Sequence, residues 1–153
     1  MRALTFTFFL LALLLDLGIA KAWADSGEWT QDQRVNAQNF IDAVVAHNEA
    51  AQILNNGGAG SLMSLMTAEE EKSLIAKLQE AYEHANAVRD DVLDKIHPDL
   101  KHYWKDKFTE GLRLELSNLS GKGDVVAEVK GSALLDEFGD WLQANGAQIH
   151  IPK

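Results

Sequence analysis

The chain has 153 residues, 23 acidic and 14 basic side chains, a formal net charge of −9 and no cysteine. An acidic surface repels phosphate backbones and anionic lipid, so we expect neither nucleic acid nor a membrane surface as a partner. The absence of cysteine excludes disulfides, thiol catalysis, iron–sulfur ligation and covalent haem attachment.

The N-terminal stretch, residues 1–24, has the layout of a secretory signal peptide. A positively charged start precedes an apolar run from Ala3 to Leu15, and small residues stand at Ala22 and Ala24, where a signal peptidase would recognise them. Asp16 and the shortness of the run, about 13 residues where a spanning helix needs about 20, argue against an uncleaved membrane anchor. We expect cleavage after Ala24, with Ala22 as the alternative, and no stable membrane insertion afterwards.

Residues 25–153 would then form a single exported domain that folds on its hydrophobic core alone. Small extracellular eukaryotic domains usually carry disulfides, whereas this chain has none. We therefore expect an exported protein, periplasmic or secreted, of bacterial origin.

The first predicted helix begins at Thr30. With Gln33 it forms a capping box, in which the Thr30 hydroxyl accepts a backbone N–H and Gln33 reaches back to the backbone. Apolar positions then recur at steps of four and three down to about Asn55, which predicts one buried helix face. These positions are Phe40, Val44, His47, Ala51 and Leu54. The glycine-rich stretch 55–60 lacks a following Lys-Ser/Thr pair, so we interpret it as a connector and not as a phosphate loop.

A second capping box, Thr67 with Glu70, predicts the start of the next helix. Its apolar positions again follow steps of four and three: Leu74, Leu78, Ala81, Ala85, Val88 and Val92. We expect this helix to continue to Ile96, because Pro98 lacks an amide proton and disfavours the helical conformation at His97.

Proline suits the first position of a helix, so the third helix is predicted to run from Pro98 to Leu119. The alternation in Leu112–Leu116 is also typical of a strand, but the longer pattern favours a helix. That pattern consists of Leu100, Trp104, Phe108, Leu112, Leu116 and Leu119. Gly111 would let a neighbouring element approach closely.

The last segment is less regular. Asp124 is a candidate helix cap, and Gly131-Ser132 would weaken or divide the stretch that follows it. The helical pattern is clearer over Ala133–Asn145. The alternating stretch Gln148–Lys153 is expected to lie extended across the domain on its two isoleucines.

Four amphipathic segments joined by short loops predict an all-α fold. We expect a four-helix, up-and-down bundle after the signal peptide, with room for a bend at Pro98.

No catalytic motif is visible in the sequence, since it has no Gly-Xaa-Ser-Xaa-Gly elbow and no Walker or dinucleotide glycine pattern. Glu80 and His84 are four residues apart but lie away from the apolar face, which argues against a di-iron site. His47 lies on the apolar face, where a hydrogen-bonded core histidine is the usual interpretation and a ligand the rarer one. Asn48 and Glu49 beside it are interpreted as helix-surface residues. We predict that the protein is not an enzyme.

The remaining candidate site lies at the joint between the second and third predicted helices. Asp94 and His97 precede the joint, and Asp99, His102 and Asp106 follow it at helical spacing. Imidazole and carboxylate groups suit zinc and other first-row divalent ions, so these five residues are the metal-site candidates. The alternative is a solvated face whose aspartates complement helix dipoles. On that alternative, which we favour, the protein has no cofactor.

Two functions remain open. The first is a non-catalytic module that binds another protein as a periplasmic adaptor, chaperone or regulator. The second is a helical bundle that binds a small ligand or a divalent metal through the joint or His47.

Overall fold

The computed structural model of the chain describes residues 29–56, 66–121 and 125–151. These residues form helices, turns and short extended links with no strand among them, which confirms the all-α prediction. The helices are α2 (Gln31–Asn56), α3 (Ala68–Ala87), α4 (Asp90–Ile96), α5 (Leu100–His102), η4 (Tyr103–Thr109), α6 (Glu110–Leu119), α7 (Val125–Asn145) and η5 (Gly146–Gln148). The predicted signal peptide, the glycine-rich connector beyond residue 56, Asp124 and the last two residues lie outside the described part of the chain.

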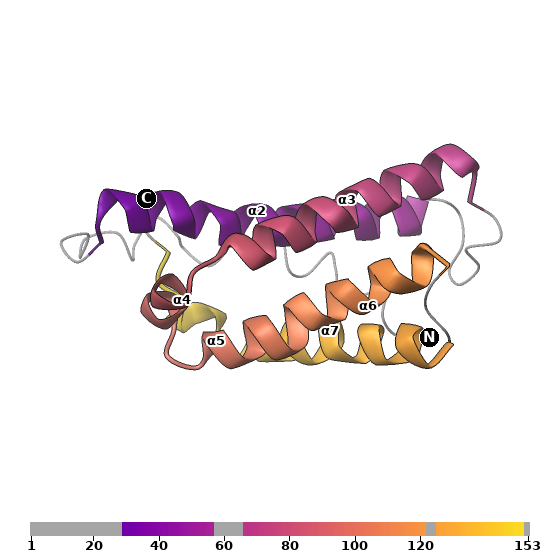
Figure 1. Cartoon of the computed structure of the whole chain (residues 1–153). Helices are drawn as coiled ribbons and strands as arrows, with labels where there is room; N and C mark the ends of the chain where they lie inside the picture. The colour runs from indigo at the N-terminus through magenta and orange to yellow at the C-terminus, as the bar shows by residue number, and fades with distance from the viewer. Residues whose placement is uncertain (1–28, 57–65, 122–124, 152–153) are drawn as a thin grey trace.

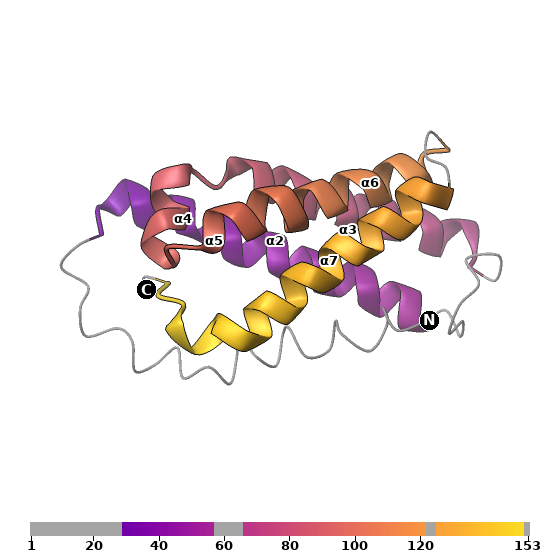
Figure 2. The same cartoon turned by 90° about the horizontal axis from the view of Figure 1, so that it is seen from below.

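The long helices pair in two layers. Helices α2 and α3 lie side by side and run in opposite directions, and the continuous run α5–η4–α6 pairs in the same way with α7 (Figure 1). Seen from below, α7 crosses the molecule obliquely, and the turn between α4 and α5 lies at one end (Figure 2). Among the described helices, none is both long and apolar enough to span a lipid bilayer.

The two layers meet on a column of aromatic side chains. Trp104 packs against Phe40 and Phe108 with ring centroids 4.6 Å apart in each case, and Phe108 lies 4.8 Å from Phe138. All four side chains are almost completely buried. Aromatic pairs at such distances contribute about 0.5–1.5 kcal/mol each beyond the area they bury, so this column holds the layers together.

Both predicted capping boxes are confirmed. Gln33 N–H donates to the Thr30 hydroxyl at 3.2 Å, and Thr30 N–H donates to the Gln33 side chain at 3.2 Å. The pair Thr67 and Glu70 makes the same reciprocal bonds, at 3.2 and 2.8 Å. Satisfied first-turn amides explain why α2 and α3 begin where the sequence predicts.

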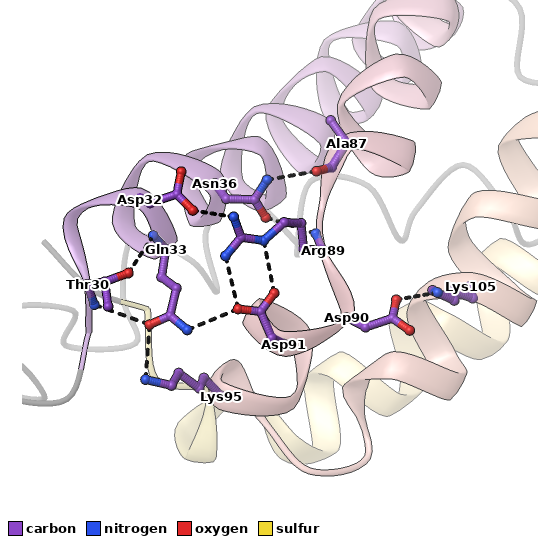
Figure 3. Close-up of polar contacts among 10 residues, drawn as sticks. All are labelled: Thr30, Asp32, Gln33, Asn36, Ala87, Arg89, Asp90, Asp91, Lys95 and Lys105. Atoms are coloured by element: carbon purple, nitrogen blue, oxygen red, sulfur yellow. Dashed lines mark hydrogen bonds and ion pairs between the residues drawn. The ribbon is translucent and has the colours of Figure 1, made fainter.

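The prediction of one continuous helix up to Ile96 is wrong, because the chain is extended at Val88 and Arg89. A residue of another helix stabilises this break. The Asn36 side chain in α2 donates to the Ala87 carbonyl and accepts from the Arg89 N–H, each at 2.8 Å. One amide thus satisfies a free acceptor and a free donor at the break, as Figure 3 shows.

Charged side chains surround this break. The Arg89 guanidinium pairs with Asp32 of α2 and with Asp91 of α4, and Gln33 donates to Asp91 at 3.0 Å (Figure 3). These bonds raise the pKa of Arg89 and lower the pKa of the Asp91 carboxyl. They link the start of α2 to α4 and fix the direction in which α4 leaves the break.

The third predicted helix differs from expectation at its start and in its first turns. Pro98 and Asp99 form a turn, α5 begins at Leu100, and residues Tyr103–Thr109 form a π-helix. The expected start at Pro98 is therefore wrong by two residues. The strand alternative for Leu112–Leu116 is excluded, because these residues lie in α6.

The apolar spacing accounts for the π-helix. Leu100, Trp104, Phe108 and Leu112 recur every four residues and are all fully buried. Four residues of an α-helix turn roughly 40° past a complete turn, so such a series would drift round the helix. The wider turn of a π-helix, with i→i+5 hydrogen bonds, offsets that drift and keeps the series on one face.

Gly131 does not divide the last helix, contrary to expectation, because α7 runs from Val125 to Asn145. A Cβ atom at Gly131 would lie 3.1 Å from the Leu114 Cβ and 3.3 Å from the Gly111 carbonyl oxygen. The two glycines therefore permit α6 and α7 to approach closely, as predicted for Gly111. Beyond α7, Gln148 lies in η5 and is not extended as predicted, whereas Ile149 and Ile151 follow without helix and pack on the core as predicted.

Candidate functional site: a pocket at the α4–α5 turn

The turn between α4 and α5 is held by contacts on both sides. His97 has the extended conformation (φ −165°, ψ 138°) that a following proline favours. Its Nδ1 accepts the Asp99 N–H at 3.1 Å, and its ring meets Trp141 of α7 edge-on at 5.2 Å. From the C-terminal segment, the His150 N–H donates to the Ile96 carbonyl at 3.0 Å. The turn thus has one conformation fixed by α7 and by the end of the chain.

A shallow, open pocket of about 680 Å³ lies beside this turn. Its size is within the range of ligand-binding pockets, about 300–1,000 Å³. The lining residues come from α4, the turn, α5, η4 and α7: Asp94, Pro98, Asp99, Lys101, His102, Tyr103, Lys105, Asp106 and Trp141.

The wall of the pocket is aromatic. Tyr103, the first residue of the π-helix, stacks on Trp141 with ring centroids 4.9 Å apart and planes 19° apart. Trp141 also stacks on the buried Phe138, with 6.3 Å between centroids. The wall is therefore continuous with the core, and side-chain motion that would close the pocket is restricted.

The sequence-predicted candidates are divided between the pocket and the core. Asp94, Asp99, His102 and Asp106 line the pocket, whereas His97 is buried beneath the turn and is not among the lining residues. His102 Nδ1 lies 2.7 Å from Asp106 Oδ2, and both side chains are 63% exposed. Within the described part of the chain, no three His, Asp or Glu side chains lie close enough to hold one metal ion. The five candidates thus include one close pair, but they do not converge on a single point.

Five lining residues are not among the predicted candidates: Pro98, which marks the joint in the sequence, and four others. Lys101 and Lys105 could have been identified as neighbours from the sequence, because they are four residues apart and therefore share one helix face. Tyr103 is adjacent to the candidate His102 in the sequence, and it lies partly buried at the boundary of the core. Trp141 had no local signal, since only the packing of α7 brings it to the turn.

Both lysines of the pocket pair with Asp90, which is not a lining residue. Lys101 Nζ lies 2.7 Å from Asp90 Oδ2, and Lys105 pairs with Asp90 Oδ1 (Figure 3 shows the Lys105 pair). Hydrogen bonds from Lys101 and then Lys105 lower the pKa of the Asp90 carboxyl, and Asp90 in turn raises the pKa of Lys101. Both ammonium groups are thereby drawn toward Asp90.

The second candidate position, His47, lies half-buried at the edge of the core, with its Nδ1 shielded from solvent. Its ring meets Phe108 edge-on at 5.5 Å, and within the described residues its buried Nδ1 has no hydrogen-bond partner. Burial lowers the pKa of His47 to about 4, so the imidazole is neutral at pH 7.

The interpretation of Asn48 as a surface residue is wrong, because Asn48 is 2% exposed and its amide also lacks a partner in the described part. Glu49 does lie at the surface, where it pairs with Lys77 at 2.7 Å.

A scan against protein-family models, a search of curated proteins and a search of solved structures each gave no match.

Proposed function

We propose that the protein is an exported four-helix, up-and-down bundle that acts as a non-catalytic protein-interaction module, an adaptor, chaperone or regulator of the bacterial periplasm. Its partner binds at the pocket beside the α4–α5 turn. The observation that carries this proposal is the stacked Tyr103–Trp141 wall in an open pocket with a charged rim.

Two observations support the bundle and its export. Four long segments, namely α2, α3, the run α5–η4–α6, and α7, alternate in direction (Figure 1), which is the arrangement of an up-and-down bundle. Residues 1–24 have the charge and apolar pattern of a signal peptide.

The chemistry of the pocket favours a protein partner. Tyr and Trp are enriched at the centres of protein interfaces, where they supply a large contact area at a low cost in side-chain entropy. The rim residues Asp94, Asp99, His102 and Lys105 are exposed and surround that wall. An aromatic centre inside a polar rim is the usual anatomy of such a contact surface.

Site-specific crosslinking in cells tests the proposal. A photo-crosslinking amino acid is placed at position 102, on the pocket rim, and at position 126 in a matched control, because Val126 is 72% exposed at the start of α7. We expect a defined crosslinked adduct from position 102, identified by mass spectrometry, that position 126 does not give. The adduct should be lost when Trp141→Ala removes part of the wall. Equal adducts from both positions, or none from position 102, would contradict the proposal.

A divalent metal ion at the pocket is the second candidate function. The observation in its favour is the 2.7 Å contact between His102 Nδ1 and Asp106 Oδ2, two ligand types that suit zinc. Zinc titration followed by elemental analysis tests it. Near-stoichiometric zinc that is lost in His102→Ala would establish the metal site, and a metal-free protein whose melting temperature zinc leaves unchanged would exclude it.

A further inference from the structure

We infer that the pocket at the α4–α5 turn receives an arginine side chain of the partner protein, its guanidinium lying against the Tyr103–Trp141 wall and its charge facing the aspartates of the rim. This inference rests on the proposed function, because it names the chemistry of the partner at the same pocket.

The first argument is the balance of charge around the pocket. Three aspartates, Asp94, Asp99 and Asp106, line it against two lysines. Both lysines pair with Asp90, which is not a lining residue. The carboxylates therefore outnumber the ammonium groups at the surface of the pocket, and a cation is the ligand charge that the pocket favours.

The second argument is that two of these carboxylates are available. Asp106 already contacts His102 at 2.7 Å. Within the described residues, the side chains of Asp94 and Asp99 make no hydrogen bond and no close ion pair, and both residues are exposed. A carboxylate can accept two parallel hydrogen bonds from one guanidinium. Either of these two carboxylates could do so without first losing a hydrogen bond of its own.

The third argument is the shape of the wall. Tyr103 and Trp141 stack with their ring planes nearly parallel, 19° apart, and Trp141, which is 8% exposed, is fixed by Phe138 and His97. The aromatic surface that a ligand meets is therefore mainly that of the half-buried Tyr103. A cation over an aromatic face is attracted by the ring quadrupole, and a guanidinium also stacks because it is planar. Arginine therefore fits this wall better than lysine, whose ammonium is a compact and strongly hydrated charge.

Peptide titration tests the inference. The purified protein is titrated with acetyl-Gly-Gly-Arg-Gly-Gly-amide and with the same peptide carrying citrulline, which keeps the planar shape but removes the charge. Binding is followed by the indole N–H signal of Trp141 in NMR, assigned with Trp141→Phe. We expect the arginine peptide to bind on the order of tenfold more tightly than the citrulline peptide, with a lysine peptide between them.

Paired variants localise the effect. Asp94→Asn with Asp99→Asn should weaken the arginine peptide on the order of tenfold. The matched control, Glu83→Gln with Glu128→Gln, removes the same charge from exposed positions of α3 and α7 and should change affinity less than about twofold, as long-range charge is screened. All four substitutions are at exposed side chains, and circular dichroism confirms that each variant is folded.

Equal affinity for the arginine peptide and the citrulline peptide would overturn the inference. An equal loss of affinity for the arginine peptide in the Asp94/Asp99 double variant and in the Glu83/Glu128 control variant would also overturn it. The proposed function would survive either result if position 102 still gives its specific crosslink. If that crosslink is absent while the arginine peptide binds at Trp141, the proposed function fails and the arginine specificity of the pocket stands.

Discussion

Asn36 and Arg89 are joined by a 2.8 Å hydrogen bond across 53 positions of sequence, from the Arg89 N–H to the Asn36 side-chain oxygen. The nitrogen of the same amide donates to the Ala87 carbonyl. One side chain of α2 therefore stabilises the interruption between α3 and α4, and the interruption sends α4 to the end of the molecule where the pocket forms.

Asn36→Ala should lower the free energy of unfolding by about 1–2 kcal/mol, because it removes the partners of one backbone donor and one backbone acceptor. Urea denaturation measures the change. The control is Asn86→Ala, which removes an exposed bond from Asn86 to the Tyr82 carbonyl within a helix and should stay within about 0.5 kcal/mol of the parent protein. An equal effect of the two substitutions would show that the Asn36 bonds do not stabilise the break.

Trp104→Phe should destabilise the protein by about 1–3 kcal/mol. The Trp104 indole N–H donates to the buried Ala85 carbonyl at 3.0 Å, and this is the carbonyl that Arg89 would bond if α3 continued. Phenylalanine keeps an aromatic ring beside Phe40 but leaves that carbonyl without its donor. Thermal unfolding of the variant measures the loss, and a melting temperature equal to that of the parent protein would contradict this role of the indole.

His47 should make stability depend on pH. Burial lowers its folded-state pKa from 6.5 to about 4, so between these values the unfolded chain binds a proton that the folded protein does not. The contribution of His47 to the free energy of unfolding is therefore fully present above pH 6.5. It decreases as the pH falls toward 4, by up to about 3 kcal/mol.

Urea denaturation at pH 7.5 and at pH 4.5 checks this for the parent protein and for His47→Phe. We expect a smaller loss of stability between the two pH values in the variant, because phenylalanine does not titrate. The same loss in both proteins would assign the pH dependence to other groups.

Gly131→Ala should destabilise the contact between α6 and α7, even though alanine is about 1 kcal/mol better than glycine inside a helix. The new methyl group would lie 3.1 Å from the Leu114 Cβ and 3.3 Å from the Gly111 carbonyl, and neither atom is at the free end of a side chain. Overpacking costs about 1–3 kcal/mol, so we expect a net loss of about 1 kcal/mol in urea denaturation. A stabilised variant would mean that helix propensity outweighs packing at this position.

Local signals in the sequence predicted the starts of α2 and α3 correctly. The Thr30 and Thr67 capping boxes and the stop before Pro98 depend on residues within one helical turn, and the structure has all three. Three features depend on contacts between distant segments: the break at Arg89, the close approach at Gly131 and the burial of Asn48. The pattern of α3 alone continues through the break without interruption, so no reading of that segment could have located it.

The candidate site was predicted in part for the same reason. Four of the five predicted residues line the pocket because they flank Pro98 within a short stretch of sequence. The aromatic wall needs Trp141, which reaches Tyr103 through the packing of α7 on η4. The recurrence of apolar residues every four positions from Leu100 to Leu112 is visible in the sequence and is compatible with the π-helix, but it predicts an ordinary α-helix equally well.

Backbone amide NMR spectra of the protein, recorded with and without the partner identified by crosslinking, locate the contact surface directly. Binding at the pocket predicts that the largest shift changes occur at residues 94–106 and at the Trp141 indole, with small changes in the first turns of α3 and α7. Largest changes in those first turns, with residues 94–106 unaffected, would contradict the assignment of the α4–α5 pocket as the binding surface.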